Sequence, residues 1–429
     1  MTLRKTVCLK RIGGDRQGEL AAGNFFASEK VTAAKIVASW SDRTGAAAED
    51  RHMLAIQDTS EIKLRTTAER RRGLGQCGHG NAYGVLAHVM LAVDADSGAC
   101  LGLVGGEIWN RDEKVATPLR RRALSDRESL RWLNAAEQAK EVLAPAAMIT
   151  IVGDRENDMY PMWASIPEPG VHLLIRAQSD RRLAGPEEAT LFTAAATWHL
   201  AGTRAIEIPA RPPDRAKRTA AVEMRFGEVE IRRPVNEKDR TLAETVRLRL
   251  VEVCETHPPD CVDPVHWRLL TTHDVGDAAK AWQIVAWYQA RWNIEQLFRV
   301  TKKHGLGLEQ SQLGSAERLV KLTAVAIKAA CIDMQLVQER DGKHGLPAST
   351  VYSEPEIDTI EVLSPTLEGR TERQKNPHPE RSLARASWVM ARLGGWNCYY
   401  TPAGPITMHR GGERFHAIHH GRTLGSMME

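Results

Sequence analysis

Five polar residues that could handle a phosphate group or a metal ion recur in one segment, which the sequence predicts to be a long helix over residues 276–303. At about 100° per residue, their side chains fall within an arc of roughly 80°. They are Tyr288, Arg291, Glu295, Arg299 and Lys302. One face of the helix therefore presents an acid among cations and a phenol. Such a face is also ordinary on an exposed helix, because residues four apart, such as Arg291 and Glu295, form ion pairs.

The residues that flank this face are heavily apolar. They are Trp287, Trp292, Ile294, Leu297 and Phe298. A helix with that much apolar surface is mostly buried, so its polar stripe must face a partner or a cavity. Charged groups that face a cavity indicate function. From spacing alone, a functional face and an exposed face with ion pairs are equally supported.

Two aspartates follow short apolar runs that predict buried strands. The run from His52 ends at Asp58, and the run from Met148 ends at Asp154. Functional sites on α/β sheets commonly lie at the carboxyl ends of strands. With Glu295, the two aspartates would form an all-oxygen ligand set, which suits Mg²⁺ or Mn²⁺ better than Zn²⁺. Two such ions about 3.5–4 Å apart can hold the attacking and leaving oxygens of a phosphoryl transfer, and the nearby cations would face phosphates.

The elements that must position these residues alternate in type. Strands are predicted at 85–93 and 100–108, joined in a hairpin by the turn at 94–98, and again at 172–176. A helix is predicted at 129–143. From about residue 179 to 272, turn residues separate short alternating runs, which indicates a β-rich insertion. Beyond it, we expect helices at 315–340 and 382–393, a loosely structured linker at 341–380 and a Gly-, Pro- and His-rich tail.

Composition excludes several classes of protein. The chain of 429 residues carries 58 basic and 54 acidic residues, a net charge of only +4, although basic clusters recur at 70–72, 120–122, 215–218 and 232–233. Each cluster by itself is more typical of a solvated surface than of a binding site. The seven cysteines form no CxxC pair, and Cys77 with His79 supplies too few ligands for a metal site. We find no signal peptide and no apolar run of membrane-spanning length, so we expect a cytoplasmic protein.

The helix carries a more specific signal. Tyr288, Arg291, Glu295 and Lys302, with gaps of two, three and six residues, resemble the Y-R-E-K signature of the insertion-sequence-four family of bacterial DDE transposases. The structural prototype of that family is the transposon-five transposase. The segments 57–60 and 153–158 resemble the family's sequences around its two catalytic aspartates. The resemblance extends from about Phe25 to near Phe415.

This resemblance implies a fold and a division into domains. The fold is α/β, with an RNase H-like mixed-sheet core over residues 49–178 and 273–310. The β-rich insertion at 179–272 interrupts this core. Residues 311–429 would form a mainly helical region suited to dimerisation. Because the match begins partway into the family's N-terminal DNA-binding domain, residues 1–48 are expected to be the truncated remainder of that domain.

The resemblance also implies roles for individual residues. Asp58, Asp154 and Glu295 would be the catalytic residues and would bind two Mg²⁺ (or Mn²⁺) ions. Tyr288, Arg291 and Lys302 match positions that hold phosphates at the transposon end, Arg299 matches a further basic DNA contact, and Arg176 matches an arginine near the bound end. Trp267 corresponds to a tryptophan on which a flipped base stacks, although a core tryptophan of the insertion is an equal alternative. We expect Asp158 to support the site rather than bind metal.

The implied activity is cut-and-paste DNA transposition. Metal-dependent endonuclease cleavage, hairpin formation and strand transfer would act on the terminal inverted repeats of an insertion sequence and on target DNA. The partners would be double-stranded DNA and a second copy of the chain, and the location cytoplasmic, at the nucleoid when DNA is bound. Two alternatives stay open: a truncated DNA-binding inhibitor of a full-length transposase, and an RNase H-like nuclease that cuts without joining. A histidine-dependent hydrolase has no supporting spacing.

Overall fold

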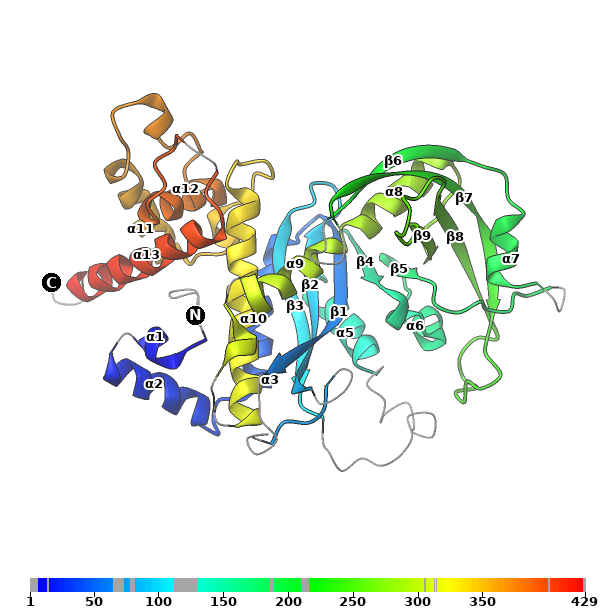
Figure 1. Cartoon of the computed structure of the whole chain (residues 1–429), viewed down its shortest axis with the longest axis horizontal. Helices are drawn as coiled ribbons and strands as arrows, with labels where there is room; N and C mark the ends of the chain where they lie inside the picture. Colours follow the sequence, from blue (N-terminus) through cyan, green and yellow to red (C-terminus); the bar gives the residue numbers. More distant parts are fainter. Residues whose placement is uncertain are drawn as a thin grey trace. The chain divides into compact units, whose positions relative to one another are not determined.

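The computed structural model describes residues 7–13, 15–64, 73–77, 82–111, 130–185, 189–209, 216–304, 306–311, 313, 315–399 and 402–426. These residues form a mixed α/β fold with nine strands and a helical C-terminal region (Figure 1). The chain divides into two compact units. The first comprises Met1–Ala123, Glu141–Ala147 and Trp292–Glu429, and the second comprises Leu124–Lys140 and Met148–Arg291. None of the helices in the described part of the chain is long and apolar enough to cross a membrane.

The first unit contains three antiparallel strands of the nine-stranded mixed sheet. They are β1 (His52–Leu64), β2 (Tyr83–Asp94) and β3 (Cys100–Trp109), in the order β3-β2-β1. Both β2 and β3 are buried along most of their length, as expected for apolar strands that are covered on two faces. At the predicted turn, the Asp94 carboxylate accepts the backbone N–H groups of Asp96 and Ser97. The predicted hairpin is confirmed.

The strand predicted from His52 was expected to end at Asp58, and this prediction is wrong. The observed strand, β1, continues to Leu64 and stays paired with β2 as far as the Leu64–Tyr83 pair. The apolar run ends at Asp58, but strand pairing needs only backbone hydrogen bonds, and Ile62 and Leu64 are again buried. Asp58 therefore lies in the middle of a strand.

Helix α10 (Ala316–Glu339) packs against β2 and β3 and confirms the helix predicted at 315–340. Trp40 is completely buried beside this layer, and its indole Nε1 donates a hydrogen bond of 3.2 Å to the carbonyl of Ala324 in α10. A Cβ atom on Gly106 of β3 would overlap the His88 carbonyl and lie 3.2 Å from the Trp40 ring. The close approach of β3 to the His88 carbonyl of β2 and to the Trp40 ring thus requires a glycine at position 106.

The N-terminal helices are anchored to α10 through its lysines. They comprise α1 (Leu9–Gly13), α2 (Arg16–Ala27), α3 (Ala33–Ala38), the 3₁₀ turn η1 (Ser39–Ser41) and α4 (Thr44–Ala47). The buried Lys321 ammonium donates to the carbonyls of Phe26 and Ser28, at the C-terminal end of α2. Lys328 donates to the carbonyl of Trp40 at 2.6 Å. Cations stabilise helix C-termini, where backbone carbonyls lack partners.

The C-terminal region contains more helix than the sequence predicts. It comprises α11 (Glu354–Thr366), α12 (Leu383–Leu393) and α13 (Pro405–Ser426), with the 3₁₀ turns η7 (Leu308–Gln310), η8 (Ala348–Thr350) and η9 (Glu372–Gln374). The helix predicted at 382–393 is confirmed. The prediction of a loose linker is wrong for residues 354–366, and the Gly-, Pro- and His-rich tail is helical over residues 405–426. A capping box between Ser353 and Glu356 starts α11, and Gly411 lets the backbone of α13 pack closely against α12.

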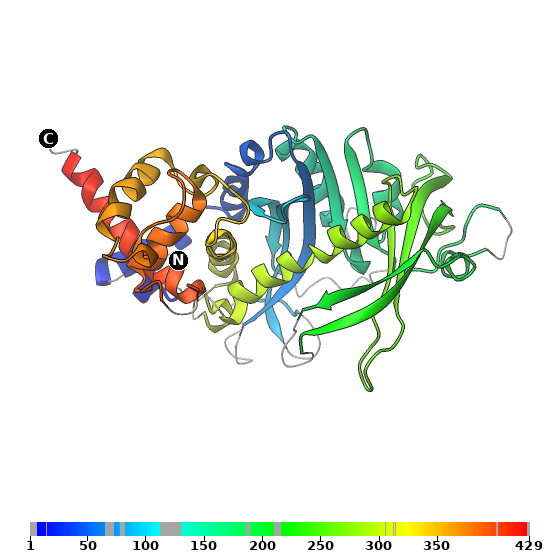
Figure 2. The ribbon, with the colours of Figure 1, turned by 90° about the horizontal axis from the view of Figure 1, so that it is seen from above.

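The second unit contains the other six strands of the nine-stranded sheet. Strands β4 (Met148–Gly153) and β5 (Val171–Arg176) run parallel, and β9 (His266–Thr271) pairs antiparallel with β5. Next come β8 (Thr245–Glu255), β7 (Arg218–Arg232) and β6 (Gly202–Ile208), all antiparallel. The predicted β-rich character of residues 179–272 is confirmed, and Figure 2 shows β7 and β8 as long, curved strands.

Short helices complete this part of the chain. They are α5 (Leu130–Val142), the 3₁₀ turn η5 (Arg155–Asn157), α6 (Tyr160–Ser165), α7 (Leu191–Ala196) and α8 (Ala278–Gln289). The predicted start of α5, at residue 129, lies outside the described residues.

The single helix predicted over 276–303 is wrong, because the chain forms three pieces there: α8, then α9 (Trp292–Arg299), then a π-helical turn, η6 (Val300–His304). At the break, the Arg291 N–H bonds to the Tyr288 carbonyl, three residues back, in place of the α-helical four.

Two adjacent glycines of α13 give a test of its packing against α12. A Cβ atom on Gly411 would overlap the carbonyl of Met390, whereas one on Gly412 would meet nothing within 4 Å. We expect Gly411→Ala to lower the free energy of unfolding by about 1–3 kcal/mol through overpacking. Gly412→Ala should be neutral or stabilising by up to about 1 kcal/mol, because alanine favours helix. Urea unfolding followed by circular dichroism measures both, and equal effects of the two substitutions would contradict this packing.

Candidate active site

Asp154 is presented by a tight turn at the end of β4. As the sequence predicts, it directly follows the last residue of this strand, Gly153. Its carboxylate accepts the N–H of Glu156 at 2.8 Å and so caps the 3₁₀ turn η5. A Cβ atom on Gly153 would overlap the amide group of Asn157, whose side chain is completely buried. The position of the Asp154 carboxylate therefore depends on a glycine at position 153.

Three other predicted site residues meet in the same unit. The Tyr288 side chain is only 6% exposed. Burial is the largest effect on the pKa of its phenol and raises it. The negative charge of Asp154 raises this pKa further, whereas the positive charges of Arg291 and Arg176 lower it. The Trp267 ring lies edge-on to the Tyr288 ring, with 5.4 Å between the ring centres. Arg176 donates to the His266 carbonyl at 2.7 Å, and desolvation lowers the pKa of its guanidinium. The structure thus surrounds a buried phenol with cations and an aromatic ring.

A basic cavity of about 210 Å³ opens beside Arg176. Its lining residues are Arg155, Arg176, Ala177, Gln178, Phe192, His266 and Arg268. The Arg268 guanidinium lies over the Phe192 ring, 3.9 Å from its centre. Hydrogen bonds with Cys254 and Glu252 raise the pKa of His266 to about 9, so its imidazole is protonated at neutral pH. Such a concentration of cations suits an anion of the size of a phosphate group.

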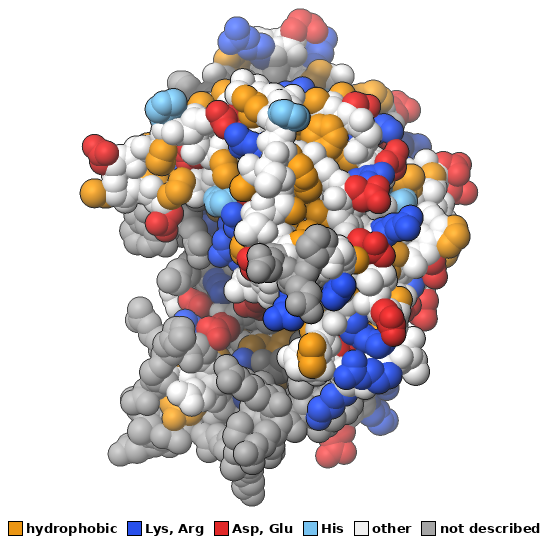
Figure 3. Space-filling view, turned by 90° about the vertical axis from the view of Figure 1, so that its right-hand side faces the viewer, with side chains coloured by type: hydrophobic (Ala, Val, Ile, Leu, Met, Phe, Trp, Pro, Cys, Tyr) orange, Lys and Arg blue, Asp and Glu red, His pale blue; other side chains and the backbone are white. Residues whose placement is uncertain are grey.

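The sequence analysis did not identify Arg155, His266 or Arg268. Their positions in the sequence could have indicated them as site residues, because Arg155 directly follows Asp154 and the other two flank Trp267. Successive residues of a strand point to opposite faces, so His266 and Arg268 share one face and Trp267 takes the other. The cavity is a local feature. Over the face seen in Figure 3, basic and acidic side chains are interspersed.

Asp158 has a structural role. Its carboxylate is fully buried and accepts hydrogen bonds from the N–H groups of Gln178 and Ser179, from the Trp163 indole and from Arg181. Arg181 approaches it to 2.7 Å in an ion pair that is also buried. These bonds hold the segment after β5 against η5 and α6. The geometry agrees with the expected supporting role, because the carboxylate's lone pairs are already used.

In the first unit, Asp58 is half-buried in the middle of β1, and its carboxylate accepts the N–H of Thr59 at 2.8 Å. Its two neighbours point to the opposite face of the strand. There the buried His88 bonds to the Thr59 hydroxyl at 2.9 Å and to the Gln57 side chain at 3.1 Å. This network fixes β1 on both sides of Asp58, which gives the aspartate a rigid support.

Glu295 and Lys302 belong to elements of the same unit as Asp58. Helix α9 packs against β1, and Glu295 is half-buried on it. Lys302 is carried by the π turn η6. Burial lowers the pKa of its ammonium group, while the charges of Glu309, Glu61 and Asp58 raise it. Lys302 therefore lies in an acidic environment on the Asp58 side of the unit.

The predicted site residues are thus distributed over both units. Asp154, Arg176, Trp267, Tyr288 and Arg291 belong to the second unit, and Asp58, Glu295, Arg299 and Lys302 to the first. The five residues predicted on one helix lie on α8, in the turn at 290–291, on α9 and on η6. Tyr288 is buried, whereas the Arg299 side chain is exposed. No protein-family model matches the chain.

The turn that presents Asp154 can be tested directly. In Gly153→Ala, the new methyl group must displace either Asn157 or the Asp154 backbone, and we expect a loss of about 1–3 kcal/mol in unfolding free energy. Amide hydrogen exchange of residues 150–160 should accelerate as well. Gly276→Ala is the matched control, since a Cβ atom there meets no atom closer than 4.0 Å. Unchanged exchange in Gly153→Ala would show that the turn tolerates a side chain.

Proposed function

We propose that this protein is a DNA transposase of the cut-and-paste type, in which Asp58, Asp154 and Glu295 bind the catalytic metal ions. One observation carries the proposal: Asp154 lies in the second unit with the half-buried Arg176 and Trp267 and the buried Tyr288, and its charge acts on Tyr288. A carboxylate beside arginines, a phenol and a half-exposed indole suits a nucleic-acid strand, because phosphates pair with arginine and bases stack on aromatic rings.

The order of elements supports an RNase H-like core. The antiparallel strands β1, β2 and β3 come first, then α5, then β4, α6 and the parallel strand β5. The two aspartates occupy β1 and the residue directly after β4, as the proposal requires. We propose on this basis that residues 49–178 and 273–310 form the catalytic core.

The three carboxylates fit hard divalent ions. Each of Asp58, Asp154 and Glu295 is half-buried, so each is open to solvent, in contrast to the enclosed Asp158. Two Mg²⁺ (or Mn²⁺) ions held by them would activate a water or a 3′-hydroxyl and stabilise the leaving oxygen. The fit rests on an all-oxygen donor set.

The remaining residues would bind and orient DNA. Arg176, Arg291 and Lys302 would pair with strand phosphates, and Tyr288 would support the indole of Trp267 from one edge. The half-exposed Trp267 ring would take a base that leaves the stack while the strand end folds into a hairpin. We propose that the substrates are the terminal inverted repeats of an insertion sequence and its target DNA, and that two copies of the chain assemble on them in the cytoplasm, at the nucleoid.

The decisive experiment is cleavage of a labelled duplex that carries the terminal repeat of the parent element. We expect Mg²⁺-dependent nicks and hairpins that EDTA abolishes. Asp58→Asn, Asp154→Asn and Glu295→Gln should each lower the rate by at least about 100-fold, because each removes a metal ligand. Gln296→Ala, at the exposed neighbour of Glu295, and Glu168→Gln should keep wild-type rates.

The outcomes separate the candidate functions. Binding of the repeat without cleavage by the wild type would favour the inhibitor. Cleavage without strand-transfer products would favour a plain nuclease. Cleavage that survives all three carboxylate substitutions would refute the proposed site.

Trp267 should act at the hairpin step. Loss of its ring removes a base-stacking contact worth about 1–3 kcal/mol. We therefore expect Trp267→Ala to slow hairpin formation by roughly 5- to 150-fold and to leave the first nick near its wild-type rate. Trp267→Phe should recover part of the hairpin rate. Gel analysis of nicked and hairpin products measures both steps, and equal loss of the two would assign Trp267 a purely structural role.

A further inference from the structure

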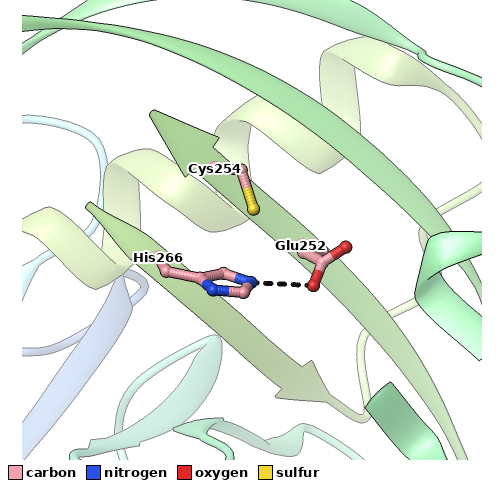
Figure 4. Close-up of side chains that lie close together, drawn as sticks. All are labelled: Glu252, Cys254 and His266. Atoms are coloured by element: carbon pink, nitrogen blue, oxygen red, sulfur yellow. Dashed lines mark hydrogen bonds and ion pairs between the residues drawn. The ribbon is translucent and has the colours of Figure 1, made fainter. Parts of the chain in front are cut away.

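A cluster of three different metal-ligating side chains lies on β8 and β9, within the second unit. Glu252 and Cys254 are two residues apart on β8, so they point to the same face of the sheet. His266 on β9 lies directly opposite Cys254 in the antiparallel register. One ligand atom from each of the three lies within 4.8 Å of the others. Figure 4 shows the sulfur of Cys254 and the carboxylate of Glu252 turned toward the His266 ring.

The chemistry of the three donors differs from that of the proposed catalytic carboxylates. A thiolate, an imidazole and a carboxylate form a mixed set that Zn²⁺ accepts and that Mg²⁺ disfavours. Three protein ligands around a tetrahedral ion leave one position for water. Among the described residues, this is the one group of three or more such side chains with ligand atoms this close together.

Arg268, which is not one of the three candidate ligands, already holds the Glu252 carboxylate in place. Glu252 Oε1 accepts from His266 Nε2 at 2.9 Å and from Arg268 Nε at 2.8 Å. Arg268 is fixed in turn by its position over Phe192. An ion bound to Oε1 would replace the imidazole N–H, and Arg268 would keep donating to the carboxylate. Carboxylates that bind metals are commonly oriented by such a donor.

The charge of a bound divalent ion would be balanced by its own ligands, even though arginines lie nearby. A Cys254 thiolate and a Glu252 carboxylate together carry two negative charges, which neutralise a divalent ion. The thiol proton of Cys254 and the additional proton of the His266 imidazolium both pass to solvent when the ion binds. Affinity should therefore depend strongly on Cys254, because the other anionic ligand already shares its charge with Arg268.

The cluster is accessible from one side and rigid on the other. The Glu252 side chain is 8% exposed, whereas that of His266 is 38% exposed. An ion can thus enter on the His266 side without any movement of the backbone. All three residues lie on hydrogen-bonded strands, which hold ligand atoms more firmly than loops do.

We propose that Glu252, Cys254 and His266 bind one Zn²⁺ ion as a clip between β8 and β9. The clip would fix His266, whose carbonyl accepts the hydrogen bond of Arg176 and whose neighbour in the chain is Trp267. This inference does not depend on the proposed transposase activity, because the ligands are distinct from Asp58, Asp154 and Glu295.

Titration of the full-length, metal-free protein with Co²⁺ tests the site. We expect one ion per chain, with a thiolate-to-cobalt absorption band that Zn²⁺ abolishes and excess Mg²⁺ leaves unchanged. Cys254→Ser and His266→Ala should weaken binding by at least about 100-fold, and Cys254→Ser should lose the band completely. Cys261→Ser is the matched control, because this exposed cysteine lies between the same two strands.

A second measurement guards against variants that merely fail to fold. Zn²⁺ should raise the unfolding temperature of the wild type and of Cys261→Ser, and should slow alkylation of Cys254. It should do neither in His266→Ala, whose unfolding temperature without metal should fall only modestly, because the substitution removes the bond between His266 and Glu252. The absence of stoichiometric Co²⁺ binding by the wild type, or an unchanged band in Cys254→Ser, would overturn the zinc site. Both results are independent of DNA cleavage.

Discussion

The burial of α10 is the interaction on which most of the first unit depends. This helix packs against β2 and β3, against α2 and α3, and against α12 and α13 (Figure 1). A helix surrounded in this way must satisfy every polar group it buries. Lys321 and Lys328 do so by donating to carbonyls of the N-terminal helices. Because α9 and η6 also rest on α10, the positions of Glu295 and Lys302 depend on the same core.

The Asp158 carboxylate and those of the three proposed metal ligands differ in how far they are enclosed. Asp158 is enclosed and accepts bonds from two backbone N–H groups, an indole and Arg181, so it stabilises the fold. Asp58, Asp154 and Glu295 are half-buried on supports that are themselves rigid. A carboxylate that is open to solvent and fixed in place can bind an ion with little reorganisation. This difference in exposure is one reason for the proposal that the three bind metal ions.

Strand β9 serves two purposes through the simple alternation of its side chains. Trp267 points to one face and lies against Tyr288, whereas His266 and Arg268 point to the other and contact Glu252. A displacement of the side chains on one face shifts the backbone of β9, and this shift also moves the side chains on the other face. We therefore expect the proposed zinc clip and the base-stacking tryptophan to influence each other, because the hydrogen bond from Arg176 ends on the same strand.

The sequence by itself determined the elements whose periodicity is strong, namely β2, β3, α10, α12 and the β-rich segment, and it placed Asp154 at the end of β4. Tertiary structure decided the rest. β1 extends past Asp58 because β2 offers it partners, and α13 can pack closely on α12 because position 411 is a glycine. The Glu252, Cys254 and His266 cluster depends on the register of β8 with β9. Such a register is fixed by the loop that joins the two strands and by which faces of the sheet are buried, and both are known only from the folded structure.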